Sequence, residues 1–364
     1  MSNKNVMASL MLNLGLLLAG AQMTGAQSVG VCYGRNGNNL PTQAEVIELY
    51  NANNIGRMRI YDPDQATLQA LRGSNIELIL GINDNLQSLT DASTASTWVQ
   101  NNVVAFSSDV KIKYIAVGNE VPPGDANAPY VLPAMQNIQN ALASANLQGQ
   151  IKVSTAITSD LLSISYPPSN GAFSDAASQF ISPIVTFLVN KSTPLLANIY
   201  PYFSYTDNMQ SFDLAYALFT SPGAVVTDGA YQYQNLFDAL VDSLYSALER
   251  VGGSSLTIVV SESGWPSSEG GTAASPDNAG TYYANLISHV KSGTPKRPGP
   301  AIEAYLFAMF DENLKDAGVE QHFGLFTASK QPKYQLSFAL ENETTRDYTY
   351  SCNKGAFVLI HWQM

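Results

Sequence analysis

The amino-acid sequence predicts an α/β fold, a (β/α)8 barrel, from two observations. The first is a set of eight short apolar runs of the kind that form parallel strands buried on both faces. The second is the helix-like pattern between most of these runs, because alternating strands and helices are typical of parallel sheets. A chain of 364 residues is long enough for such a barrel. Periodicity alone leaves an open doubly wound sheet as an alternative. The expected strands are Val29–Tyr33, Gly56–Tyr61, Ile76–Ile82, Tyr114–Asn119, Ile151–Thr155, Leu195–Tyr200, Leu256–Ser261 and Ile302–Met309.

Three of the helix-like segments have clear signals. Thr42–Asn53 starts on a threonine with Glu45 three residues later, which is the pattern of a capping box. Gln234–Val251 carries four leucines on one stripe and ends before two glycines. Asp277–Lys291 has a similar pattern. Because each segment lies between two expected strands, these patterns support the β–α alternation.

Two glutamates lie where expected strands end. The segment Leu256–Ser268 reads LTIVVSESGWPSS and contains Glu262, and Lys113–Pro123 reads KYIAVGNEVPP and contains Glu120. Counting strands places Glu120 after strand four and Glu262 after strand seven, at the edge where barrel active sites form. A carboxylate there is costly to desolvate unless it is paired or has a function. Two carboxylates facing one cleft are the apparatus of glycoside hydrolysis, and the alternative for each is a structural ion pair.

Aromatic residues accompany the expected strand ends and one long loop. The stretch Pro201–Tyr233, after strand six, is an aromatic-rich insert that we expect to form a small subdomain beside the cleft, because long loops in compact domains are usually functional. Four aromatic residues are candidates for stacking on sugar rings, although aromatic side chains are as often part of the core. These candidates are Tyr33, Tyr200, Phe203 and Trp265.

Two further motifs complete a family pattern. NIYPYF is found at Asn198–Phe203 and FAMFDENLK at Phe307–Lys315. Together with the two glutamate motifs, they resemble plant endo-β-1,3-glucanases of glycoside hydrolase family 17, from about Ser28 to Phe338. The resemblance implies the barrel rather than the open sheet. It also implies an endo-acting hydrolase that cleaves internal β-1,3-glucosidic bonds of callose or fungal wall glucan with retention.

The resemblance implies roles for several residues. Glu262 would be the nucleophile, which must be ionised, and Glu120 the general acid and then base, which must hold a proton. Asn119 resembles the residue that contacts the sugar 2-hydroxyl. Glu312, Lys315 and Glu320 match residues that accompany the catalytic pair. Lys315 is expected to keep Glu262 ionised or to hold Glu312, and the alternative is a solvated i to i+3 pair.

Two other functions stay open from sequence. A β-1,3-1,4-glucanase uses the same scaffold and the same catalytic residues, so subsite shape must separate the two activities. A catalytically inactive glucan-binding protein is the second alternative. The presence of both catalytic glutamates, Glu312 and Lys315 argues against an inactive protein.

Composition narrows the possible partners. The net charge of −11 argues against nucleic acid and anionic membranes, whereas a neutral polysaccharide is compatible. The three histidines are scattered, no His/Cys cluster has metal-ligand spacing, and there is no Gly-rich phosphate loop. We therefore expect a monomer with a β-glucan substrate, no metal and no cofactor.

The ends of the chain indicate processing. Residues 1–26 have the pattern of a signal peptide, which leaves a catalytic domain at 27–340 and a C-terminal extension at 341–364. No later segment is long and apolar enough to span a membrane, so we expect a secreted or vacuolar protein. Asn190 and Asn342 lie in glycosylation acceptor motifs. Cys32 is expected to be a buried free thiol, and the redox state of Cys352 is open.

Overall fold

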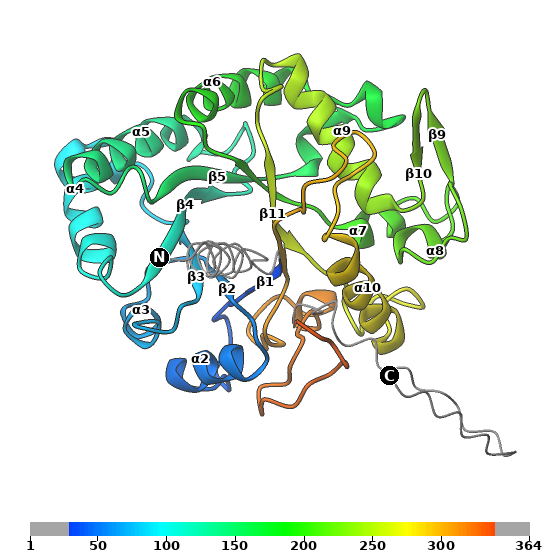
Figure 1. Cartoon of the computed structure of the whole chain (residues 1–364), viewed down its shortest axis with the longest axis horizontal. Helices are drawn as coiled ribbons and strands as arrows, with labels where there is room; N and C mark the ends of the chain where they lie inside the picture. The colour runs from blue at the N-terminus through cyan, green and yellow to red at the C-terminus, as the bar shows by residue number, and fades with distance from the viewer. Residues whose placement is uncertain (1–28, 339–364) are drawn as a thin grey trace, which may run out of the picture.

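The computed structural model describes residues 29–338 and shows a closed barrel of eight parallel strands. Hydrogen-bonded neighbours follow the order β1-β12-β11-β8-β5-β4-β3-β2 around the barrel, with helices arranged outside it (Figure 1). All eight expected runs form barrel strands, so the (β/α)8 prediction is confirmed and the open sheet is wrong. The strands are β1 (Val29–Cys32), β2 (Arg57–Ile60), β3 (Glu77–Ile82), β4 (Lys111–Asn119), β5 (Lys152–Thr158), β8 (Leu195–Asn198), β11 (Ile258–Ser263) and β12 (Ala304–Leu306).

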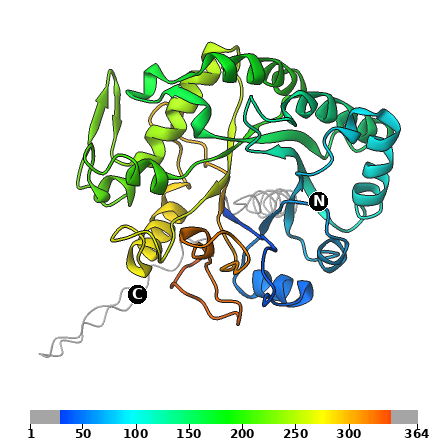
Figure 2. The ribbon, with the colours of Figure 1, turned by 180° about the vertical axis from the view of Figure 1, so that it is seen from behind.

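The outer layer consists of helices that follow the barrel strands. The capping box of α2 is present as predicted: the Thr42 side chain accepts from the Glu45 backbone, and the Glu45 side chain accepts in return. Within the described residues no α-helix follows β12, and a 3-10 turn, η5 (Val319–Gln321), takes its place. Figure 2 shows this last segment, in orange, beside the blue strand β1. The helices are α2 (Gln43–Ala52), α3 (Gln65–Ala70), α4 (Ala92–Val99), α5 (Ala128–Ser144), α6 (Asp175–Lys191), α9 (Leu236–Arg250) and α10 (Pro276–His289).

Two inserts interrupt the alternation. The predicted insert after the sixth barrel strand contains α7 (Pro201–Thr206), α8 (Leu214–Ala217) and a hairpin of β9 (Val226–Asp228) and β10 (Tyr231–Tyr233). A second insert follows β5 and was not expected. It contains the short turns η3 (Ser159–Leu161) and η4 (Pro168–Asn170) and a hairpin of β6 (Leu162–Ile164) and β7 (Ala172–Phe173). Its strands are too short to give a readable alternation.

The second insert explains why α9 is buried on nearly every side. An apolar stripe alone predicts one buried face, yet every residue from Leu236 to Leu248 is buried. Gly171 makes the close approach possible, because a Cβ there would lie 2.0 Å from the Ser243 carbonyl oxygen. Asp242 of α9 is also buried, and its carboxylate accepts from Thr294 Oγ1 (2.5 Å) and the Lys296 backbone (2.9 Å). Burial raises the pKa of Asp242 to about 6.

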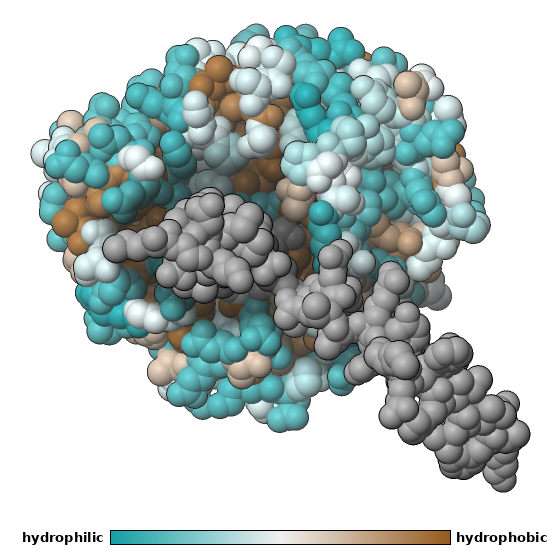
Figure 3. Space-filling model, in the orientation of Figure 1, coloured by the Kyte–Doolittle hydropathy of each residue, from teal (hydrophilic) through white to brown (hydrophobic). Residues whose placement is uncertain are grey.

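The hydrophobic core has two parts. A larger cluster fills the space between strands and helices, and a smaller cluster, which includes Cys32, Ile79 and Leu196, occupies the barrel interior. Hydrophilic residues dominate the periphery of the molecule in Figure 3, while hydrophobic residues gather toward the middle of this face. Within residues 29–338, Cys32 is buried and free, as predicted, and burial raises its pKa. Cys352 and Asn342 lie outside the described residues.

Among the described residues, none of the helices combines the length and the apolar character that crossing a bilayer requires.

Candidate active site

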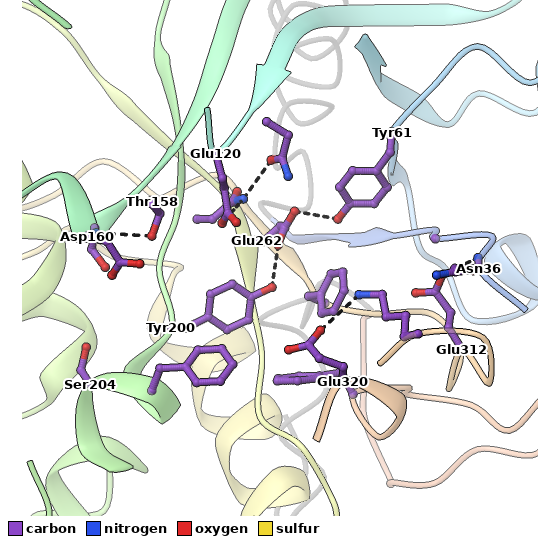
Figure 4. A pocket seen from close by; sticks show the side chains of 18 of the residues that line it. Asn36, Tyr61, Glu120, Thr158, Asp160, Tyr200, Ser204, Glu262, Glu312 and Glu320 are labelled. Atoms are coloured by element: carbon purple, nitrogen blue, oxygen red, sulfur yellow. Dashed lines mark hydrogen bonds and ion pairs between the residues drawn. The ribbon is translucent and has the colours of Figure 1, made fainter. Parts of the chain in front are cut away.

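A cavity of about 910 Å³ opens at the C-terminal edge of the barrel. Its lining residues follow β1, β2, β4, β5, β8, β11 and β12, and both predicted catalytic glutamates are among them. Figure 4 shows Glu120 and Glu262 in the middle, with Asp160 and Ser204 toward one end and Asn36 and Glu312 toward the other. We call this cavity the cleft. No cluster of three or more His, Cys, Asp or Glu suited to a metal ion is found in residues 29–338.

Glu262 is held from several sides by donors. Register shifts on both sides of β11 near its end mark a bulge, and bulges commonly re-aim side chains beside active sites. Arg59 Nη1 lies 2.9 Å from Glu262 Oε1. The hydroxyl groups of Tyr61 and Tyr200 donate to Oε1 and Oε2 at 2.7 Å and 2.6 Å. One positive charge and two short hydrogen bonds contact the two oxygens of this carboxyl group and fix its orientation.

Glu120 has a different setting. The chain leaves β4 through two positive φ angles, +78° at Gly118 and +54° at Glu120. Glycine adopts the first at no steric cost, while a left-handed glutamate stores about 1–2 kcal/mol of strain. The turn projects the Glu120 carboxyl into the cleft, where it receives a 2.8 Å hydrogen bond from Asn198 Nδ2. The enclosing cleft walls and the negative charge of Glu262 raise the pKa of Glu120.

A buried polar network joins the two glutamates. Asn198 Oδ1 accepts from Arg59 Nη1 (2.9 Å) and from Ser261 Oγ (2.8 Å), while its Nδ2 reaches both Glu120 and Asn119. Asn119 Oδ1 also accepts from Arg59 Nη2 at 2.7 Å. Asn119 lines the cleft, and its Nδ2 has no hydrogen-bond partner among the described residues. The network therefore presents that amide as a free donor beside the glutamate pair.

The predicted supporting residues lie at the Asn36 end of the cleft. Glu312 is 3% exposed, accepts from the Asn36 backbone at 2.7 Å, and has its pKa raised by burial. Gly34 leaves room for it, because a Cβ there would lie 2.3 Å from Glu312 Oε2. Lys315 Nζ pairs with Glu320 Oε2 at 3.4 Å and lies 4.3 Å from the centre of the Phe307 ring. The cation that pairs with Glu262 is therefore Arg59, and the expected direct pair of Lys315 with Glu312 does not form.

The aromatic candidates divide into two groups. Tyr200 and Phe203 line the cleft, and Phe203 is 37% exposed. Tyr33 is 2% exposed and packs edge-on against Phe310, so it is part of the core. Trp265 is completely buried, and its Nε1 donates to the Ala273 carbonyl. The prediction that Tyr33 and Trp265 stack on sugar is wrong, because neither ring reaches the cleft.

Sequence reasoning missed three residues that build the site. Arg59 is a charged residue inside a buried strand, and that position alone signals a buried ion pair. The sequence puts Tyr61 at the end of an expected strand and Asn198 at the start of the NIYPYF motif, and neither position by itself indicates a role in the site. Their partners come from strands far apart in sequence, so no local pattern could reveal the contacts.

Comparisons with known proteins agree with this geometry. A family model described as Glycosyl hydrolases family 17 matches residues 29–338. A glucan endo-1,3-beta-glucosidase from Vitis vinifera is 65% identical over 90% of this chain and 96% of its own. A basic vacuolar isoform from Nicotiana tabacum, also named glucan endo-1,3-beta-glucosidase, is 54% identical over 90% of each chain.

Solved structures give the same result. A structure from a study of two plant beta-glucan endohydrolases with distinct substrate specificities has a TM-score of 0.82 and 47% identity, over 85% of this chain and 99% of its own. CJP38, a beta-1,3-glucanase and pollen allergen of Cryptomeria japonica, has a TM-score of 0.83 and 46% identity, over 86% and 99%. The chain therefore belongs to glycosyl hydrolase family 17.

Proposed function

We propose that this protein is a retaining endo-β-1,3-glucanase. The observation that carries the proposal is the contrast between two glutamates in one cleft. Glu262 is held by the Arg59 cation and two tyrosine hydroxyls, as a nucleophilic carboxylate needs, while the pKa of Glu120 is raised, as a proton donor needs. A retaining glycosidase requires two carboxyl groups with these different roles. The names of the family relatives supply the β-1,3 linkage.

The reaction follows from these states. Glu120 gives its proton to the glycosidic oxygen as the bond to the anomeric carbon breaks, and a Glu262 oxygen forms an ester with that carbon. Glu120, now a carboxylate, takes a proton from water. The water oxygen then attacks the anomeric carbon, and Glu262 leaves as the carboxylate. Both glutamates return to their starting states, and the configuration at the anomeric carbon is retained.

The other cleft residues have binding roles in this proposal. The free amide of Asn119 donates to the 2-hydroxyl of the reacting sugar, and the rings of Tyr200 and Phe203 contact neighbouring units. Glu312, Lys315 and Glu320 bind hydroxyl groups at the Asn36 end. Because the cleft continues on both sides of the glutamate pair, a chain can bind through its interior, which suits endo cleavage.

The nucleophile is tested by covalent labelling. A fluorinated β-1,3-oligoglucoside should leave its label on Glu262, located by peptide mass mapping. Glu262→Gln should lower kcat by several orders of magnitude. Glu120→Gln should spare activated aryl glycosides in the first step, because a good leaving group needs no proton. Label on another glutamate, or product released first as the α-anomer, would overturn the roles.

The preference for β-1,3-glucosidic bonds is tested with polysaccharide substrates. Laminarin should be cut to short oligosaccharides from within the chain. Cleavage of lichenan with laminarin untouched would instead support the β-1,3-1,4-glucanase, and the solved relatives include enzymes with distinct specificities. Binding of both polysaccharides without any cleavage would indicate a glucan-binding protein.

Processing and location form a second part of the proposal. Residues 1–26 act as a signal peptide, 27–340 form the catalytic domain, and 341–364 are a C-terminal extension of a monomeric, secreted or vacuolar protein. Family relatives include a vacuolar isoform, which is compatible with this route. Asn190 is exposed in the last turn of α6, before β8 begins, and therefore lies on the barrel face opposite the cleft. A glycan at Asn190 would therefore leave the cleft open. Size-exclusion chromatography of the purified protein would test whether it is a monomer.

A further inference from the structure

We propose that a second cavity beside the cleft binds additional glucosyl units of the same glucan molecule. This cavity has a volume of about 550 Å³, within the range of about 300–1,000 Å³ that is usual for small-ligand sites. Asp62 lines both cavities, so the two adjoin at the Asn36 end of the cleft. We call it the side cavity. The inference rests on the proposed glucanase activity and goes beyond it, because it assigns a separate subsite.

The walls of the side cavity come from two neighbouring segments. One is the loop after β3, with Asn83, Asp84 and Asn85. The other is the exposed side of α4, where Thr97 and Trp98 contribute side chains. The loop follows β3 and therefore lies at the catalytic edge of the barrel, and α4 forms a wall of the same cavity. A glucan that leaves the cleft over Asp62 therefore meets this surface first.

The helix beside the cavity has an irregular continuation that helps to shape it. After Val99, α4 passes into a π-helical turn, Gln100–Val104, and such turns are frequent at functional sites. Asn101 and Asn102 in this turn line the cavity. Asn102 is fixed by Gln65 Nε2 (2.8 Å) and by its own bond to the Trp98 carbonyl (2.9 Å). The wall is thus held by hydrogen bonds that do not involve a ligand.

The chemistry of the lining suits a neutral sugar. Side-chain amides and hydroxyls provide paired donors and acceptors, and the partly exposed Trp98 ring provides an apolar face for sugar C–H groups. The cavity is lined by no Lys, Arg or His, which disfavours phosphate or another anion. Arg35 lies on the cleft side, where it pairs with Asp62 and Asp64 and fixes the boundary between the two cavities.

Two parts of a glucan can supply these glucosyl units. One is the main β-1,3 chain continuing past the end of the cleft, and the other is a β-1,6-linked branch. Both present the same neutral hydroxyls and apolar ring faces. The experiment below separates them.

The test fills the side cavity from α4. Thr97→Trp places a large side chain in the cavity from an exposed position, and Ser96→Trp makes the same change at the adjacent exposed residue, which does not line it. Asn101→Ala is a second, milder variant that removes an amide from the lining. All variants are compared by kcat/KM on linear β-1,3-oligosaccharides from three to nine units and on β-1,6-branched β-1,3-glucan. Thermal melting confirms that each variant folds.

The expected result is selective. Thr97→Trp should lower kcat/KM by about five- to tenfold on the substrates that reach the side cavity, which corresponds to about 1–1.4 kcal/mol. Asn101→Ala should lower it about twofold to fivefold on the same substrates. Trimer hydrolysis and the Ser96→Trp variant should be unchanged. A loss on long linear substrates identifies the main chain, and a loss on branched glucan alone identifies the branch.

Two results would overturn the inference. One is an equal loss on every substrate, which would show a general disturbance of the site. The other is no loss on any substrate in folded Thr97→Trp protein. Both results can be obtained only if the unmodified protein cleaves these glucans. If the proposed function itself is wrong, the unmodified protein will cleave none of them, so the two failures can be told apart.

Discussion

The ion pair between Arg59 and Glu262 gives the sharpest prediction about catalysis. Arg59 is 1% exposed and lies 2.9 Å from a carboxylate that is 5% exposed. Removing one partner of such a pair leaves an unpaired buried charge and costs about 3–5 kcal/mol. Arg59→Met should therefore lower the free energy of unfolding at pH 7 by about 3 kcal/mol or more.

The assay is urea unfolding at pH 7, with kcat/KM on a linear β-1,3-oligosaccharide measured alongside. Arg59→Met should lose stability, and kcat/KM should fall because the Glu262 carboxylate is no longer held in place by the guanidinium group. Arg57→Met is the matched control, because Arg57 is on the same strand and is also buried. Its Nε lies 2.8 Å from Glu77 Oε2, and this ion pair is outside the cleft.

A third variant separates charge from packing. The double variant of Arg59→Met with Glu262→Gln has no carboxylate at position 262 that lacks a charge partner. At pH 7 it should therefore unfold at a higher urea concentration than Arg59→Met alone. A loss of less than about 1 kcal/mol in Arg59→Met would refute the reasoning. So would an equal loss of stability and of kcat/KM in Arg57→Met, because the effect would then reflect loosening of β2.

Three other predictions concern stability and packing. Gly34→Ala should lower kcat/KM at least tenfold by displacing the Glu312 carboxylate, whereas Gly124→Ala, which meets nothing within 4 Å, should be neutral in the same assay. Asp242, with its pKa raised to about 6 against about 3.9 unfolded, makes folding stability fall as pH rises from 4 to 6, by up to about 3 kcal/mol. Asp242→Asn should abolish that fall in urea unfolding, and an unchanged slope would contradict it. While folded, the native protein and the Cys32→Ser variant should react with equal amounts of a thiol reagent, because the Cys32 thiol is buried and its pKa is raised. Only after denaturation should the native protein react with more reagent than the variant.

The barrel was predictable because its signals are local. Each parallel strand is a short apolar run, and each boundary is marked by residues such as the Thr42 cap, so sequence patterns give the order of elements directly. Closure is different, because it depends on pairing between β1 and β12 across the whole chain. Periodicity therefore left the open sheet as an alternative, and only the family resemblance favoured the barrel before the structure settled it.

Aromatic positions show where the sequence argument fails. Tyr33 and Tyr200 both follow barrel strands, yet one ring packs against Phe310 and the other donates its hydroxyl to Glu262. The difference depends on the direction in which the chain leaves each strand and on which residues pack over the end of that strand. Trp265 follows Glu262 closely in sequence, but its ring is buried against Tyr202 and Tyr282. Side-chain direction after a bulge cannot be read from alternation, because the bulge changes the register.

The roles proposed for the two glutamates depend on groups that are distant in sequence. Both Glu120 and Glu262 follow apolar strands, so their sequence contexts alone do not distinguish acid from nucleophile. The difference in surroundings arises at β2, where Arg59 lies against Glu262 and is linked to the Glu120 carboxyl through the Asn198 amide. One cation placed asymmetrically between two carboxyls stabilises the nearer anion most and leaves the other able to hold its proton. A neutral residue at position 59 would remove that asymmetry while both glutamates remained in place.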